Sequence, residues 1–190
     1  MLEELGVPYE VYPIDIMKNE QFAASFLALN PNNKIPVIVD PAGPGDSPFV
    51  LYESGAILVY LARKFDSSLL PADQRMRLIV LQWLMFQMGG IGPIFGQLHH
   101  FRRYAPDERY SLTRYQREVH RIYNVLNGRL EQARYLAGNS YTIADVATYP
   151  WISRFELHGI EWNQIPNVKR WHDLVGARPA VMRGMEVPRA

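Results

Sequence analysis

The sequence predicts a mixed α/β domain at the front of the chain and an all-helical domain behind it. Residues 37–39 (VIV) and 49–52 (FVLY) are short apolar segments joined by a turn rich in proline and glycine, which is typical of a β-hairpin. Residues 9–14 (YEVYPI) alternate weakly between polar and apolar side chains, as a strand does. From residue 72 onward apolar residues recur at helical spacing. We therefore expect a small sheet with helices, followed by a helical bundle.

The front domain, which we place at residues 1–65, has its predicted elements in an informative order. Residues 2–5 followed by a glycine have the pattern of a final helical turn, and the expected strand at 9–14 comes next. A short helix at 22–29, the hairpin and a helix that begins at Glu53 complete the order. This is the order of an α/β thioredoxin-like domain without its first strand and most of its first helix. Two explanations stay open: the first methionine is internal to a longer protein, or the domain is defective.

The back domain, residues 72–190, is predicted to be an all-α helical bundle. Pro93 lies inside one helical pattern and is expected to kink or end that helix. A second long helix is expected at about 111–133, where apolar residues repeat on one face. Thr142 and Asp145 have the spacing of a capping box, so another helix should begin there.

Composition argues against several classes of function. The net charge of +1 makes nucleic acid and anionic membrane poor partners. The first residues, MLEE, lack the pattern of a signal peptide, and we expect no apolar run of the about 18–20 residues that a membrane helix needs. The expectation is therefore a cytoplasmic protein. His99 and His100 are adjacent in a predicted helix and would point in different directions, so no metal site is expected.

The chain contains no cysteine. It therefore has no disulfide, no thiolate metal ligand and no thiol of its own for redox work. Any thiol chemistry must use a thiol that a ligand brings.

Residues 30–64 hold three features that would together form a binding site. Ile35–Pro36 is a candidate cis bond just before the first hairpin strand, where the Ile35 N–H and C=O would turn toward a peptide-like ligand. The helix at Glu53 begins with unpaired N–H groups and a positive dipole end, to which Ser54 adds a hydroxyl. Glu53 would hold a ligand ammonium. Although an ordinary helix start has the same residues, the combination would suit a small peptide with α-amino and α-carboxylate groups.

Four segments of the sequence resemble one family. NNKIPVIVD and LYESGAILVYLA are similar to the glutathione-binding half of the glutathione S-transferases. GGIGPIFGQLHHF and TRYQRE are similar to the bacterial Nu class, the disulfide-bond reductase-like branch. The resemblance covers essentially the whole chain. It implies a homodimer that binds glutathione as co-substrate between its two domains, and that reduces disulfides or peroxides with weaker conjugation to small electrophiles.

The resemblance also implies roles for single residues. The glutathione-binding residues that it carries over are Gln21, Ile35, Glu53, Ser54 and Arg114. Gln21 matches a glutamine that touches glutathione, and Arg114 matches a residue that reaches the site, in some cases across the dimer interface. The catalytic Ser, Thr, Asn or Tyr of the family lies in a segment without a match here, so the catalytic residue is unknown. The alternative function is therefore a glutathione-binding member without catalysis, with a regulatory or scaffold role.

Overall fold

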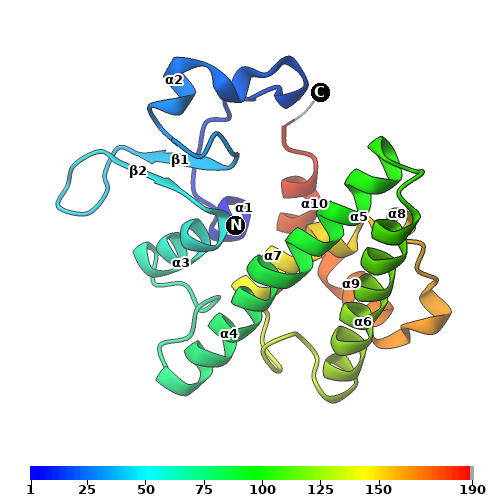
Figure 1. Cartoon of the computed structure of the whole chain (residues 1–190). Helices are drawn as coiled ribbons and strands as arrows, with labels where there is room; N and C mark the ends of the chain where they lie inside the picture. Colours follow the sequence, from blue (N-terminus) through cyan, green and yellow to red (C-terminus); the bar gives the residue numbers. More distant parts are fainter. Residues whose placement is uncertain (189–190) are drawn as a thin grey trace.

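A β-hairpin organises the front of the chain. The computed structural model describes residues 1–188, so the last two residues of the predicted second domain, 189 and 190, lie outside the described part. Strand β1 (Val37–Asp40) pairs antiparallel with β2 (Phe49–Tyr52), with Val37 opposite Tyr52. They form the only sheet within residues 1–188 (Figure 1). The predicted hairpin is confirmed.

The strand predicted at residues 9–14 is wrong. These residues have no regular secondary structure, and most of them are exposed. A strand persists only when its backbone N–H and C=O groups pair with a neighbour, and β1 pairs with β2 alone in the described sheet. The backbone N–H and C=O groups of residues 9–14 therefore have no neighbouring strand in the described part of the chain to pair with. The weak alternation of polar and apolar residues in this segment does not indicate a strand.

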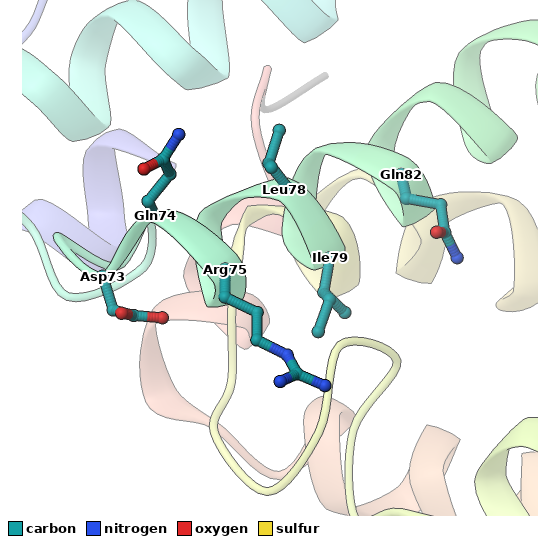
Figure 2. Close-up of a pocket in the computed structure, with 6 residues that line it drawn as sticks. All are labelled: Asp73, Gln74, Arg75, Leu78, Ile79 and Gln82. Atoms are coloured by element: carbon teal, nitrogen blue, oxygen red, sulfur yellow. The ribbon is translucent and has the colours of Figure 1, made fainter.

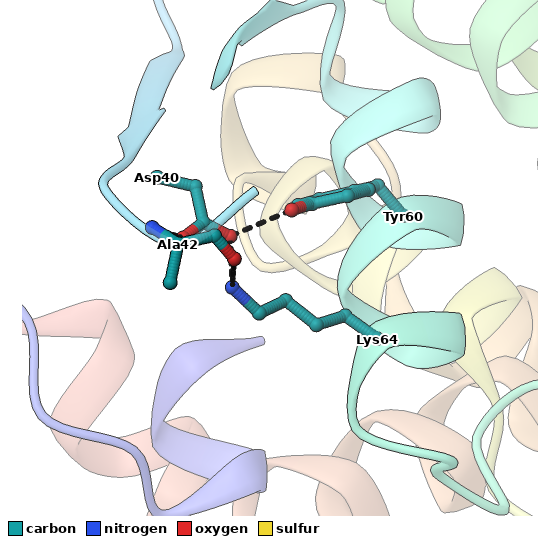
Figure 3. A network of polar contacts seen from close by, with 4 residues as sticks. All are labelled: Asp40, Ala42, Tyr60 and Lys64. Atoms are coloured by element: carbon teal, nitrogen blue, oxygen red, sulfur yellow. Dashed lines mark hydrogen bonds and ion pairs between the residues drawn. The ribbon is translucent and has the colours of Figure 1, made fainter. Parts of the chain in front are cut away.

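Helix α3 (Ser54–Lys64) covers one face of the hairpin and is fastened to it by polar contacts (Figure 3). The Tyr60 hydroxyl donates to the Asp40 carboxylate at 2.6 Å, and the Lys64 ammonium donates to the same carboxylate and, at 2.7 Å, to the Ala42 carbonyl. The rings of Phe49 and Tyr60 lie 5.4 Å apart. The hairpin and α3 therefore form one unit, in which the turn end of the hairpin is held against the second half of α3.

The remaining elements of the front domain are short. They are α1 (Leu2–Leu5), η1 (Ile16–Lys18), η2 (Glu20–Phe22) and α2 (Ala24–Leu27). The helix predicted at 22–29 thus forms only over its middle. Isolated helices of this length are unstable, so each depends on the packing around it.

The back of the chain is a bundle of helices, as predicted, with one isolated bridge between Tyr135 and Gly138. Its elements are α4 (Gln74–Phe86), η3 (Gln87–Ile91), α5 (Gly92–Tyr104), α6 (Arg109–Gln132), α7 (Ile143–Ile152), α8 (Phe155–His158), η4 (Trp162–Gln164), α9 (Pro166–Gly176) and α10 (Pro179–Met185). The second long helix predicted at about 111–133 is confirmed as α6.

The sequence predicted that Pro93 kinks or ends its helix; the predicted end is wrong, and the kink stays a prediction. The elements α4, η3 and α5 run on as one helical segment, Gln74–Tyr104. η3 is a π-helical turn, and Pro93 lies in the first turn of α5 directly behind it. Because a π turn already shifts the backbone hydrogen bonds, proline causes no break there.

The same segment corrects the expectation about apolar runs. It has 31 residues and a mean hydropathy of 1.5 in its most apolar window, so by length and composition alone it could cross a membrane. Core helices of folded domains also meet this criterion. Here one stripe of the segment lies in the helical core; its buried apolar residues are Val80, Leu84, Ile91, Phe95 and Leu98.

The predicted capping box at the start of α7 is confirmed. The Asp145 carboxylate accepts hydrogen bonds from the Thr142 N–H at 3.0 Å and the Thr142 hydroxyl at 3.1 Å. It also accepts from the Leu136 N–H at 3.0 Å and the Trp171 indole N–H at 2.8 Å. Asp145 is fully buried, so these donors supply the solvation that water would otherwise give.

The front and back domains share one apolar core. Leu58 and Ala62 of α3 belong to the same buried cluster as the central residues of α4 to α9. The Ile143 N–H of α7 donates to the carbonyl of Leu69, in the connection between α3 and α4. The division at 1–65 and 72–190 stays a prediction, because the core continues across it.

Candidate functional site

The first part of the candidate site lies at the end of the hairpin. Because Val37 lies opposite Tyr52, the preceding Ile35–Pro36 pair lies beside Glu53, which follows Tyr52. Ile35–Pro36 is cis, as predicted. Ile35 is 52% exposed. Within residues 1–188, neither backbone polar group of Ile35 has a hydrogen-bond partner, so both are free for a ligand.

The second part is the start of α3. Glu53 is its N-cap residue, but its side chain caps no N–H group. The first intrahelical bond runs from the Ile57 N–H to the Glu53 carbonyl, which leaves the N–H groups of residues 54–56 without partners in the described structure. Free N–H groups and the helix dipole make such an end attractive to an anion.

The backbone at Glu53 is unusual. Its φ of 70° and ψ of 109° lie in a region that residues other than glycine rarely adopt. Such a conformation costs about 1–3 kcal/mol and is found preferentially at binding and catalytic sites. Together with this backbone conformation, the Glu53 side chain makes no capping bond to the start of α3.

The third part is a contact that crosses from the back domain. The Ser54 hydroxyl donates to the Met88 Sδ at 3.6 Å, and Met88 belongs to the π-helical turn η3. A Cβ atom added at Gly55 would lie 3.1 Å from both the Cγ and the Sδ of Met88. Glycine at this position therefore lets η3 approach the start of α3 closely.

Two of the predicted site residues are not joined to this cluster by any contact within the described residues. Gln21 lies in η2, and its side-chain oxygen is buried without a hydrogen-bond partner. Arg114 is exposed on α6, where it lies near Glu118. The structure thus brings Ile35, Glu53 and Ser54 together, and the roles of Gln21 and Arg114 stay predictions.

Sequence reasoning missed Met88. Its position between two glycines and a predicted helix gave no sign that it would touch Ser54, 34 residues earlier. The local signal was the pair Gly89-Gly90, which directly follows Met88 in the sequence. A π turn often marks a functional site, and this one delivers a side chain to the start of α3.

The chemistry open to this site is recognition of a small zwitterion. A ligand carboxylate would be held by the free N–H groups and hydroxyl at the start of α3, and an ammonium by Glu53. Residues 1–188 hold no group of three or more His, Asp or Glu side chains that could hold a metal. The His99 ring stacks on that of His158 at 4.8 Å, whereas the His100 ring contacts Phe101, so the two neighbours point apart.

A separate hollow of about 650 Å³ lies along the outer side of α4. Figure 2 shows that the side chains around it project from this one helix. Its lining residues are Asp73, Gln74, Arg75, Leu78, Ile79 and Gln82. Because α4 and its N-cap residue Asp73 supply every lining residue, the hollow is part of an open surface.

Comparison with known proteins gives matches to two family models. Residues 1–64 match the model for the glutathione S-transferase N-terminal domain. Residues 93–179 match the model for the glutathione S-transferase C-terminal domain.

Individual relatives are similar over most of their length. The disulfide-bond oxidoreductase YfcG of Escherichia coli is 46% identical over 182 residues, which cover 94% of this chain and 84% of the relative. The disulfide-bond oxidoreductase YghU of the same organism is 37% identical over 203 residues, which cover 100% of this chain and 69% of the relative.

Solved structures are similar in fold as well as in sequence. A glutathione transferase from Burkholderia graminis, with two glutathione molecules bound per subunit, has a TM-score of 0.92 and 44% identity, covering 99% of this chain and 81% of the other. A glutathione transferase from Pseudomonas putida, with one glutathione disulfide bound per subunit, has a TM-score of 0.91 and 41% identity, covering 98% and 84%.

Proposed function

Because this chain belongs to the glutathione S-transferase family, we propose that it binds glutathione at the start of α3 and uses the glutathione thiolate to reduce small disulfides. The observation that carries the proposal is the uncapped start of α3, with the Ser54 hydroxyl, the Glu53 carboxylate and the free backbone of Ile35 around it. Relatives named disulfide-bond oxidoreductases and neighbours with bound glutathione or glutathione disulfide support the same reaction class.

The γ-glutamyl part and the central peptide backbone of glutathione have complementary groups here. Its γ-glutamyl carboxylate would accept bonds from the N–H groups of α3 and the Ser54 hydroxyl, and its α-ammonium would pair with Glu53. The peptide backbone of its central residue would exchange hydrogen bonds with the N–H and C=O of Ile35. Gln21 and Arg114 are proposed as further contacts.

The chemistry follows from the absence of cysteine. One glutathione thiolate attacks a disulfide, forms a mixed disulfide and releases one thiolate of the substrate. A second glutathione attacks the mixed disulfide, which yields glutathione disulfide and the second substrate thiol. Two glutathione molecules are thus oxidised for each disulfide reduced. Peroxides and small electrophiles are proposed as further substrates of the same thiolate, in the reducing environment of the cytoplasm.

The test measures reduction of hydroxyethyl disulfide by glutathione, with glutathione reductase and NADPH as the reporter. Ser54→Ala should raise the KM for glutathione by about tenfold or more, since a hydrogen bond to a charged group contributes about 1.5–3 kcal/mol. Ser68→Ala, in the exposed connection between α3 and α4, is the matched control. Wild-type turnover that does not depend on glutathione would refute the proposal, and glutathione binding without turnover would favour the non-catalytic alternative.

The proposal includes a homodimer formed through the outer side of α4. Leu78 and Met85 are 60% and 54% exposed and lie seven residues apart on α4, hence on one face of the helix, and Leu78 also lines the hollow in Figure 2. Exposed apolar patches of this kind mark interfaces. Leu78→Glu with Met85→Glu should halve the molar mass measured by light scattering, whereas Leu157→Glu on α8 should leave it unchanged.

A further inference from the structure

We propose that Met88 is a positioning residue of the glutathione site, which holds the Ser54 hydroxyl ready for the ligand carboxylate through its thioether. The inference rests on the proposed function and deepens it, because it assigns part of the affinity to a residue of the back domain. It is carried by the bond from the Ser54 hydroxyl to the Met88 Sδ at 3.6 Å and by the close approach at Gly55.

The first step concerns the hydroxyl rotor. A serine at the start of a helix has three staggered χ1 positions, and only some of them direct its hydroxyl at a ligand beyond the helix end. Met88 is the hydrogen-bond partner of the Ser54 hydroxyl. That bond selects one rotamer before any ligand arrives, so less conformational entropy is lost on binding.

The second step concerns the strength of the bond. A thioether sulfur is a weak acceptor, whereas a carboxylate forms a charge-assisted bond that is roughly twice as strong as a neutral one. Exchange of the Met88 sulfur for a ligand carboxylate is therefore favourable. A strong acceptor in place of Met88 would compete with the ligand, and an apolar side chain would leave the hydroxyl unoriented.

The third step concerns how Met88 is held in place. It lies in η3, between Gln87 and the glycines Gly89 and Gly90, and is packed against the helical core. On its other side it contacts Gly55, whose missing side chain leaves the space that the sulfur fills. Packing on these two sides restricts the movement of the sulfur away from Ser54.

The experiment is a double-mutant cycle on the dissociation constant of S-methylglutathione, an unreactive analogue, measured by calorimetry. Met88→Leu, which nearly conserves volume, should raise Kd about threefold in the otherwise unchanged chain. In the Ser54→Ala background the same substitution should change Kd by less than about 1.5-fold, because no hydroxyl remains to be positioned. Met182→Leu on α10, whose side chain is exposed, is the matched control and should leave Kd unchanged.

A second measurement reads the contact itself. With methionine methyl groups labelled with carbon-13, the Met88 signal should shift in Ser54→Ala and also when S-methylglutathione binds, while the Met182 signal stays in place. An equal effect of Met88→Leu in both backgrounds, or an unmoved Met88 signal, overturns the inference and leaves the proposed function standing. Failure of the wild-type chain to bind S-methylglutathione overturns both.

Discussion

His158 is a fully buried histidine whose environment keeps it neutral. Its ring packs 4.3 Å from that of Phe95 and 4.8 Å from that of His99, and the Tyr123 hydroxyl lies 2.7 Å from its Nδ1. Burial lowers the pKa of His158 to about 3, and the nearby His99, Arg102 and Arg154 act in the same direction. The side chain is therefore a stabilising core residue only as long as it stays unprotonated.

The first prediction concerns acid stability. The unfolded chain protonates this histidine near pH 6.5 and the folded chain only near pH 3, so the unfolded state binds more protons between these values. The free energy of unfolding should therefore fall as the pH falls through this window, by about 5 kcal/mol at most. Urea unfolding of His158→Gln should show a smaller slope with pH than wild type. His100→Gln, at an exposed position, should keep the wild-type slope, and equal slopes in all three proteins would contradict the prediction.

Glu53 shows which features of a single residue can be predicted from the sequence and which cannot. Its identity and that of Ser54 predicted a helix start, which the structure confirms. The positive φ of Glu53 was not predictable, because no local rule forces a glutamate into that region. The residue lies at the junction between β2 and α3, where the chain turns from the strand into the helix.

At the scale of elements, α7 depends on the buried Asp145. The carboxylate links three parts of the back domain: the start of α7, the loop at Leu136 and Trp171 of α9. None of these donors can reach water if the carboxylate is removed, since Leu136, Thr142 and Trp171 are all buried.

The second prediction follows from these unpaired donors. Asp145→Ala should lower the free energy of unfolding by about 3–5 kcal/mol, the range found when one member of a buried polar network is lost. Asp173→Ala, at an exposed position on α9, should change it by less than about 0.5 kcal/mol. Thermal unfolding of the two variants makes the comparison. A melting temperature of Asp145→Ala equal to that of wild type would show that the capping box adds no stability.

The elements that sequence predicted are those with local causes. The hairpin has its turn, α7 has its capping box and α6 has an apolar face with a regular repeat. The features that it missed depend on hydrogen bonds that no local pattern specifies. Residues 9–14 form no strand because pairing needs a neighbour, and the helix through Pro93 persists because a π turn absorbs the irregularity. The Met88 contact with Ser54 was not predictable either, because the two residues lie 34 positions apart in the sequence.

At the scale of the whole molecule, two arginine–glutamate ion pairs join the two ends of the described chain. The Arg178 guanidinium donates to both carboxylate oxygens of Glu4, at 2.8 and 2.7 Å, and lies 3.9 Å over the Tyr141 ring. Arg183 of α10 donates to Glu3 at 2.6 Å. The four-residue helix α1 could not persist alone, so α10 and its arginines hold it on the back domain.

These ion pairs link the front of the chain to the last helices, so their loss should lower the free energy of unfolding of the whole molecule. The Glu4 side chain is almost completely buried, and Arg178→Met would leave its charge without a partner. Because Arg178 itself is about one-third exposed, we expect a loss of about 2 kcal/mol instead of the full cost of a buried pair. The matched control is Lys169→Met, which breaks an exposed pair with Asp173 and should cost less than about 0.5 kcal/mol.

The stability that Arg178→Met loses relative to wild type should depend on pH. Burial raises the pKa of Glu4, but the ion pair with Arg178, together with the Tyr141 hydroxyl and the N-terminal ammonium, holds that pKa below its usual value of 4.5. The stabilisation is therefore complete above pH 4.5 and disappears as the pH falls through the lowered pKa of the folded state. The difference in unfolding free energy between wild type and Arg178→Met should shrink accordingly in acid. A difference that stays constant from neutral to acid pH would mean that Arg178 stabilises by stacking on Tyr141 and not through Glu4.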